Sequence, residues 1–364
     1  MNEPPQLVLV TSTRWPYLRD IIDLMFLQSG LGYRFRYSRD YVQPSLFENP
    51  KAMVGRTGYV VHVHTSENLS GPHGKAPRDS IHEFLPVREV TIRDVKPFGD
   101  FIWMYFEVGD WVYFTKQKTI PNEHHQAVFD SIPPESRNSL FLTLYEAPGL
   151  KLDTIPDRLS VKSEDVTANW IRIVDNMARF PDHKSRKPTY LKLISVRAKD
   201  CTNPVFPVPL SESESGYELR SDKDYRMEIF QYNDEIFAHG VPPKPFPLKL
   251  VIDKERIVPL VDEATIVGKY DFLTMHFRPS STLRSYGTTM GVEVETESEM
   301  RLTVKIHARV LRGLGQLVAS IAVAGGIGLA SLASGSFTNA SYAIAAVASL
   351  LGFVGFYYGG RIRD

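Results

Sequence analysis

The stretch VEVETESEMRLTVKIHARV, from Val292 to Val310, decides the fold expected for the region around it. Its even positions are mostly apolar and its odd positions mostly charged, which is the period-two pattern of strands with one buried face. A turn between Thr296 and Glu299 would form a hairpin and set acidic residues opposite basic ones, where each pair contributes roughly 0.2–1 kcal/mol. The rival interpretation is a helix that extends back to Met300 from the apolar segment that follows.

Short strand patterns precede this stretch along residues 189–291. Alternating runs such as Tyr225 to Tyr232 and Leu248 to Ile252 are separated by the proline-rich turns NPVFPVP and VPPKPFP. Many short strands at this spacing are typical of an all-β sandwich or barrel, and the sandwich fits better. Residues 189–312 are therefore expected to form a β-sandwich-like domain.

Residues 1–180 carry a mixed pattern. The apolar run Leu7 to Val10 predicts a strand, the amphipathic stretch from Tyr17 to Phe26 predicts a helix, and YRFRY from Tyr33 to Tyr37 predicts a second strand. An aromatic meander follows between residues 87 and 114. We therefore expect a mixed α/β domain with a β-meander over residues 1–180, and a proline-flanked linker, PDHKSRKP, over residues 181–188.

Two apolar segments dominate the C-terminal part of the sequence. They are LGQLVASIAVAGGIGLASLA, from Leu314 to Ala333, and ASYAIAAVASLLGFVGFYY, from Ala340 to Tyr358. Each has about the 20 residues that a hydrocarbon core of about 30 Å requires. Residues 313–360 are predicted to be a hairpin of two transmembrane helices, with a cytoplasmic tail at 361–364. With this hairpin, the whole chain is expected to be of the α+β class.

Basic residues flank the hairpin at both ends, which predicts a multi-pass protein of the inner (plasma) membrane with both termini in the cytoplasm. The side chains expected at the membrane interface are Arg309, Arg312, Tyr357, Tyr358, Arg361 and Arg363. Small residues at four-residue spacing indicate close helix packing, either within the hairpin or between the protomers of a homo-oligomer. These residues are Ala322, Gly326, Ala330, Gly355 and Gly359.

The turn between the first predicted strand and helix is a candidate anion site. It places Thr11, Ser12, Thr13 and Arg14 near a helix N-terminus, where exposed amides and the helix dipole favour a phosphate. The turn lacks the glycines of a phosphate loop, and hydroxyl side chains before a helix are commonly caps. Phosphate binding and simple capping are both left open.

The composition excludes several classes of function. The chain has 42 basic and 42 acidic residues, so no global field attracts nucleic acid, and direct duplex binding is not expected. Cys201 is the only cysteine, and the histidines fall at spacings that match no zinc pattern, so neither a metal nor a cofactor is predicted. No catalytic motif is present, which favours a non-enzymatic role without deciding against an enzyme.

The β-rich region followed by the apolar segment LGQLVASIAVAGGIGLASLASGSFTNASYAIAAVASLLGFVGFYYGG resembles, in architecture, the two-transmembrane effectors of prokaryotic antiviral defence systems. The resemblance implies a membrane-anchored sensor and effector. Its cytosolic part would bind a protein partner or a nucleotide-like signal, and its hairpin would oligomerise in the lipid bilayer and perturb it. The alternative is a membrane-tethered enzyme or scaffold with the hairpin as a passive anchor.

Overall fold

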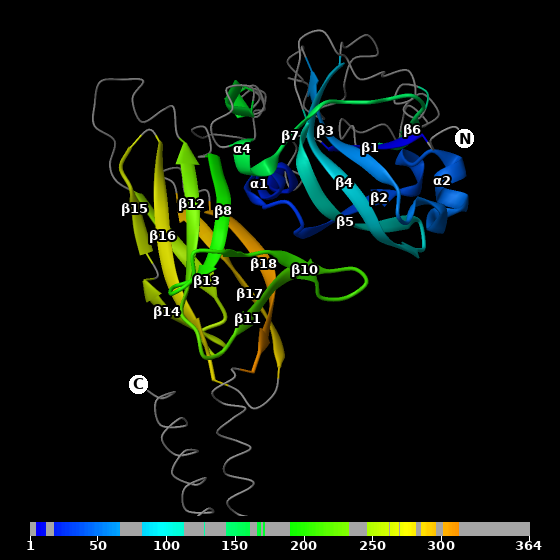
Figure 1. Ribbon diagram of the computed structural model, residues 1–364. Coiled ribbons are helices and arrows are strands. Elements are labelled where there is room, and N and C mark those ends of the chain that lie inside the picture. The colour runs from blue at the N-terminus through cyan, green and yellow to red at the C-terminus, as the bar shows by residue number, and fades with distance from the viewer. Residues whose placement is uncertain are drawn as a thin grey trace, which may run out of the picture.

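The computed structural model of the chain (Figure 1) describes residues 5–11, 18–65, 82–112, 127, 143–160, 166–168, 170–171, 190–232, 246–261, 263–268, 270–281, 285–295 and 301–312. Within these residues, the strands form three sheets. One sheet lies in the N-terminal half and two lie in the C-terminal half.

The first sheet has the strand order β2-β5-β4-β3-β1-β6, with β7 paired to β5. Its strands are β1 (Gln6–Thr11), β2 (Gly32–Ser38), β3 (Thr57–Thr65), β4 (His82–Phe98), β5 (Phe101–Val112), β6 (Leu144–Ala147) and β7 (Thr154–Ile155). The pairing of β1 with β3 is parallel, and the other pairings within the sheet are antiparallel. Gly99, with φ at 58°, makes the tight turn between β4 and β5, because glycine adopts the left-handed conformation without a steric penalty.

The helices whose bounds lie within the described residues are short. They are α1 (Leu18–Phe26), η1 (Arg39–Tyr41), α2 (Pro44–Glu48), η2 (Pro50–Met53) and α4 (Asp157–Ser160). One side of α1 buries Ile21 and Met25 in a cluster with Trp111 of β5 and with Tyr190, which begins the first strand of the C-terminal half. Helix α1 therefore fills the space where the two halves of the molecule meet (Figure 1).

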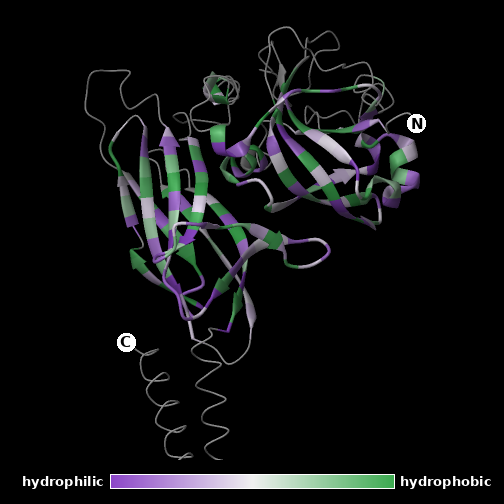
Figure 2. Ribbon diagram, in the orientation of Figure 1, coloured by the Kyte–Doolittle hydropathy of each residue, from purple (hydrophilic) through white to green (hydrophobic). Residues whose placement is uncertain are grey.

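The C-terminal half contains two sheets that pack face to face, and we call it the sandwich. A five-stranded sheet has the order β14-β16-β12-β8-β9, and a six-stranded sheet has the order β10-β11-β18-β17-β13-β15. The strands are β8 (Tyr190–Ala198), β9 (Pro204–Val205), β10 (Pro207–Pro209), β11 (Ser215–Arg220), β12 (Tyr225–Tyr232), β13 (Phe246–Ile252), β14 (Ile257–Val261), β15 (Glu263–Ile266), β16 (Tyr270–Pro279), β17 (Tyr286–Glu295) and β18 (Arg301–Leu311). Figure 2 shows the alternation of hydrophobic and hydrophilic residues along these strands. The β-sandwich-like arrangement expected for this region is present.

The predicted hairpin at Val292 to Val310 is confirmed. Strands β17 and β18 pair antiparallel, with Glu295 opposite Arg301 and Val292 opposite Val304. The apolar positions of both strands are buried in the core of the sandwich. The rival interpretation, a helix reaching back to Met300, is wrong because the chain is a strand from Arg301 onward.

The expected α+β class is wrong, because strands make up most of the described residues and the longest described helix, α1, has nine residues. Within the described residues of the range 1–180, the aromatic meander extends into a large sheet, and the helical segments, α1 among them, are short. The predicted transmembrane hairpin, residues 313–360, lies outside the described residues. Across the part of the chain that is described, no helix combines the length and the apolar character needed to cross a membrane. In that part of the chain, the structure contradicts the predicted multi-pass location in the inner membrane.

Candidate functional site

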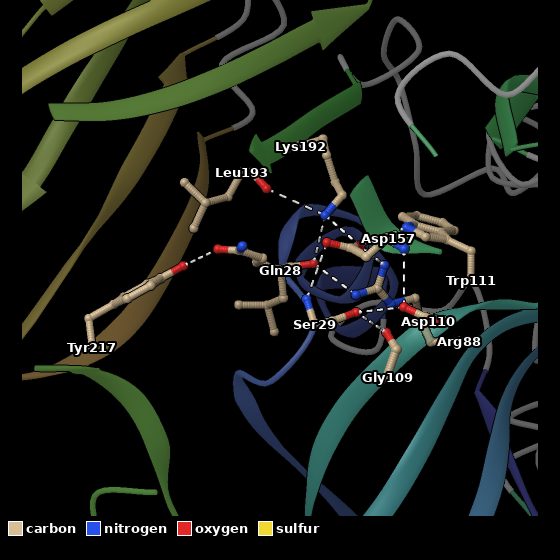
Figure 3. A network of polar contacts seen from close by, with 11 residues as sticks. Gln28, Ser29, Arg88, Gly109, Asp110, Trp111, Asp157, Lys192, Leu193 and Tyr217 are labelled. Atoms are coloured by element: carbon tan, nitrogen blue, oxygen red, sulfur yellow. Dashed lines mark hydrogen bonds and ion pairs between the residues drawn. The ribbon is translucent and has the colours of Figure 1, made fainter. Parts of the chain in front are cut away.

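Three charged side chains from three separate elements meet where the first sheet adjoins the sandwich (Figure 3). Asp157 is the first residue of α4, Arg88 lies on β4, and Lys192 lies on β8. The Oδ1 atom of Asp157 lies 2.7 Å from Nη1 of Arg88 and 2.7 Å from Nζ of Lys192. We call these three residues the junction cluster, because one carboxylate is shared by cations from both halves of the molecule.

Lys192 is buried because both faces of β8 are covered at its N-terminal end. Tyr190 and Lys192 point toward α1, while Leu191 and Leu193 point into the core of the sandwich. The Lys192 side chain is only 1% exposed. A lysine at this position needs a buried counter-charge, and Asp157 supplies it.

A β-bulge positions Arg88 and the residues around it. The register between β4 and β5 shifts between Arg88 and Val90, so that β5 carries one extra residue at Gly109 and Asp110. Arg88 lies opposite Trp111, and its guanidinium carbon is 4.6 Å from the centre of that ring. Trp111 also donates a hydrogen bond from Nε1 to Oδ1 of Asp157, at 2.9 Å.

The segment that follows α1, residues 27–30, connects the cluster to its surroundings. The carbonyl oxygen of Leu27 accepts hydrogen bonds from Arg88 Nη2 at 3.0 Å and from Lys192 Nζ at 3.3 Å. Helix α1 has no basic residue in its last turn, and these two cations lie where the helix dipole favours positive charge. Tyr217 of β11 donates a hydrogen bond to Gln28, so the segment also contacts the second sheet of the sandwich.

A second carboxylate, Asp110, supports the position of Asp157. Its Oδ1 atom accepts hydrogen bonds from the backbone N–H of Asp157 at 3.1 Å and from the hydroxyl of Ser29 at 3.3 Å. The Ser29 hydroxyl also lies 2.7 Å from the carbonyl oxygen of Gly109. Asp110 therefore ties the bulge, the start of α4 and the segment after α1 together.

Burial and charge oppose each other in this cluster. Burial lowers the pKa of Lys192 to about 8, although Asp157 raises it in part. Burial alone would raise the pKa of Asp157, but Lys192 and Arg88 outweigh it and lower that pKa to about 2. At neutral pH, Asp157 is therefore ionised, and the charge on Lys192 is sensitive to small changes in its surroundings.

In and beside the cluster, two buried polar atoms have no hydrogen-bond partner among the residues that the structure describes. They are Nε of Arg88 and the hydroxyl of Tyr190, and both atoms are buried. Native interiors satisfy the great majority of such groups. The junction therefore holds strong ionic contacts together with unsatisfied donors.

The chemistry of the cluster favours a structural contact over catalysis. Nζ of Lys192 is occupied by Asp157 and by the carbonyl oxygens of Leu27 and Leu193. An amine of lowered pKa serves as a nucleophile or base only when a substrate can reach it. The groups around Lys192 instead hold it in an ionic contact between the two halves of the protein.

The residues that the sequence singled out lie elsewhere or outside the described part. Thr11 is buried at the end of β1, opposite His62 of β3, and its hydroxyl has no hydrogen-bond partner in the described part of the chain. Arg309 lies on β18 and contacts Glu218, and Arg312 follows that strand. The other predicted site residues lie outside the described residues, namely Ser12, Thr13, Arg14, Ala322, Gly326, Ala330, Gly355, Gly359, Tyr357, Tyr358, Arg361 and Arg363. In the described ranges, no group of three or more metal-ligating side chains is present.

The sequence prediction did not include the junction cluster. A signal for two of its members is present, because Arg88 and Lys192 each interrupt an apolar, strand-like run, FLPVREV and YLKLISV. Arginine and lysine are almost never fully buried unless they are paired. Asp157 has no comparable signal, since it follows a proline in a polar segment.

The comparisons with known proteins give no family for this chain. No protein-family model matches the sequence, and no curated protein matches it.

Proposed function

We propose that this protein is a sensor that binds a signal, either a protein partner or a nucleotide-like ligand, and that the junction cluster couples its two halves. The observation that carries the proposal is that Asp157 is held at the same time by Arg88 of the first sheet and Lys192 of the sandwich. Binding of the signal to either half would then change the contacts of the other half.

An ionic junction suits a reversible coupling better than an apolar one does. Two cations share one carboxylate at this junction, away from water. A desolvated ionic contact of this kind is stable only while its geometry is maintained. When the halves separate, water solvates the three charges and offsets part of the lost contact energy. The closed and open arrangements therefore differ by a few favourable contacts, as a two-state element requires.

An enzyme is the alternative, and only the lowered pKa of Lys192 favours it. The filled contacts of Nζ weigh against it. A sensor uses the same features without requiring a substrate to reach this buried amine.

The test measures the separation of the two halves in the full chain. Cys201, exposed and the only cysteine, provides one labelling position on the sandwich, and Lys51→Cys on η2 provides another beside the first sheet. Asp157→Asn leaves two buried cations facing each other, so the distance distribution between spin labels should shift to longer and broader values. The double variant Asp157→Asn with Lys192→Met removes that repulsion and should restore the wild-type distribution.

Lys305→Met, a change at an exposed lysine on β18, is the matched control and should leave the distribution unchanged. A folded Asp157→Asn variant with the wild-type distribution would contradict the coupling. In wild type, a panel of mononucleotides and dinucleotides is then screened for a ligand that shifts the same distribution.

A further inference from the structure

The first sheet has a second feature that the junction cluster does not involve. On the side of β2, β5 and β4 that faces away from the core, basic and aromatic side chains alternate, and we call this surface the aromatic–basic face. Its members are Arg34, Arg36, Lys96, Phe101, Trp103 and Tyr105.

The sequence YRFRY explains why the arginines are on the outside. Phe35 and Tyr37 point into the core and are buried, so Arg34 and Arg36, one residue out of phase, point to solvent and are exposed. Phe35 packs edge-on against Phe106, with 5.0 Å between the ring centres, and this contact supports the register of β2 against β5. The alternation that builds the core thus also places two arginines about 7 Å apart on one open surface.

The register places these side chains as neighbours across three strands. Trp103 on β5 lies opposite Arg36 on β2 and opposite Lys96 on β4. The guanidinium carbon of Arg34 lies 5.1 Å from the centre of the Trp103 ring, and that of Arg36 lies 5.0 Å from the Phe101 ring. Planar cations and planar rings are therefore stacked along the surface, and Phe101 is 38% exposed.

The charges of this face are only partly balanced by the described carboxylates. Asp94 pairs with Lys96 at 3.1 Å, and Glu107 pairs with Arg93. Asp94 raises the pKa of Lys96, and the charge of Glu212, in the loop between β10 and β11, adds to this effect. Arg34 and Arg36 make their contacts with aromatic rings, and neither has a carboxylate partner among the residues that the structure describes. Two positive charges therefore remain available to an anionic ligand.

We propose that the aromatic–basic face binds single-stranded nucleic acid. An unpaired strand offers phosphates to the arginines, and its bases stack on aromatic rings and on guanidinium planes. A duplex hides its base faces and offers only phosphates, so it matches half of the surface. An acidic peptide likewise uses the arginines and leaves the rings without partners. The proposal goes beyond the sensor function, since none of these residues belongs to the junction cluster.

The test uses the purified full chain and a fluorescein-labelled dT12 oligonucleotide. Anisotropy should show binding, with a slope of log K against log salt of about −1.4 for two neutralised phosphates. Stacking should quench tryptophan fluorescence, and Trp103→Phe should strongly reduce that quenching, because Trp111 and Trp170 are both buried. The variant Arg34→Gln with Arg36→Gln should weaken binding at least tenfold and bring the slope close to zero.

Two further variants keep the test independent of folding. Arg256→Gln is the matched control, because this arginine also lies over a ring, Tyr286 at 5.6 Å, but on the sandwich, and binding should be unchanged. Arg36→Lys keeps the charge and removes the planar group, so the salt slope should persist while the affinity falls.

Three outcomes would overturn the proposal. The first is the absence of dT12 binding by the wild-type chain. The second is binding that the double arginine variant retains in full. The third is equally tight binding of a polyglutamate peptide or of a 12-base-pair duplex without tryptophan quenching, which would assign the face to an acidic protein or to duplex phosphates.

Discussion

At the scale of single residues, we expect a substitution of Asp157 to have the largest effect on stability. Asp157 is the carboxylate that contacts both Arg88 and Lys192, whose side chains are 0% and 1% exposed. Removing one partner of a buried ionic group destabilises a protein by about 3–5 kcal/mol, because the remaining charges stay desolvated. Asp157→Asn should therefore lower the free energy of unfolding in urea by about that amount. Asp153→Asn, a change at an exposed residue nearby, should have little effect, and equal effects of the two changes would show that the cluster is unimportant.

Lys192 predicts a dependence of stability on pH. Its pKa is about 8 in the folded protein and 10.5 in an unfolded chain, so the unfolded state binds more protons between these values. The free energy of unfolding should then rise from pH 8 to pH 10.5, by up to about 3 kcal/mol, because the buried amine loses its charge. Lys192→Met should lack this rise. Parallel urea titrations of both proteins over that range measure the difference, and identical pH profiles would refute the assignment.

At the scale of elements, the close approach of β1 and β3 is the most restrictive contact in the first sheet. A Cβ atom at Gly58 would lie 2.6 Å from the carbonyl oxygen of Leu7, a backbone atom that cannot rotate away. Gly58→Ala should therefore push the two parallel strands apart and lower the melting temperature, with a loss of about 1–3 kcal/mol. Gly287→Ala, where no atom lies within 4 Å, is the control and should be tolerated. Equal tolerance at both glycines would mean that β1 and β3 are not packed as described.

At the scale of the whole molecule, the junction should make the two halves unfold together. The cluster, α1 and the contact of Gln28 with Tyr217 all link the first sheet to the sandwich. Calorimetry of the wild-type chain should show one cooperative transition for these parts, and Asp157→Asn should separate it into two. Lys305→Met should keep the single transition. Two separate transitions in wild type would show that the halves are independent domains joined without energetic coupling.

The sequence alone determined the features that depend on neighbouring residues. The period-two alternation at Val292 to Val310 determined the β17–β18 hairpin, because the burial of one face follows directly from that period. In the same way, YRFRY determined which side of β2 is buried and which carries the arginines. The sandwich followed from many such runs in succession.

Only the tertiary structure decided the class of the whole chain and the candidate site. Pairing of β strands across long separations joined the described strands of residues 1–180 into one large sheet, so the α+β expectation was wrong. Arg88 bonds to Asp157, which lies 69 positions further along the chain. Lys192 donates a hydrogen bond to Leu27, at a separation of 165 positions. No local pattern encodes such meetings, because a charged side chain becomes an ion-pair partner only when other elements bury it and bring a counter-charge within contact distance.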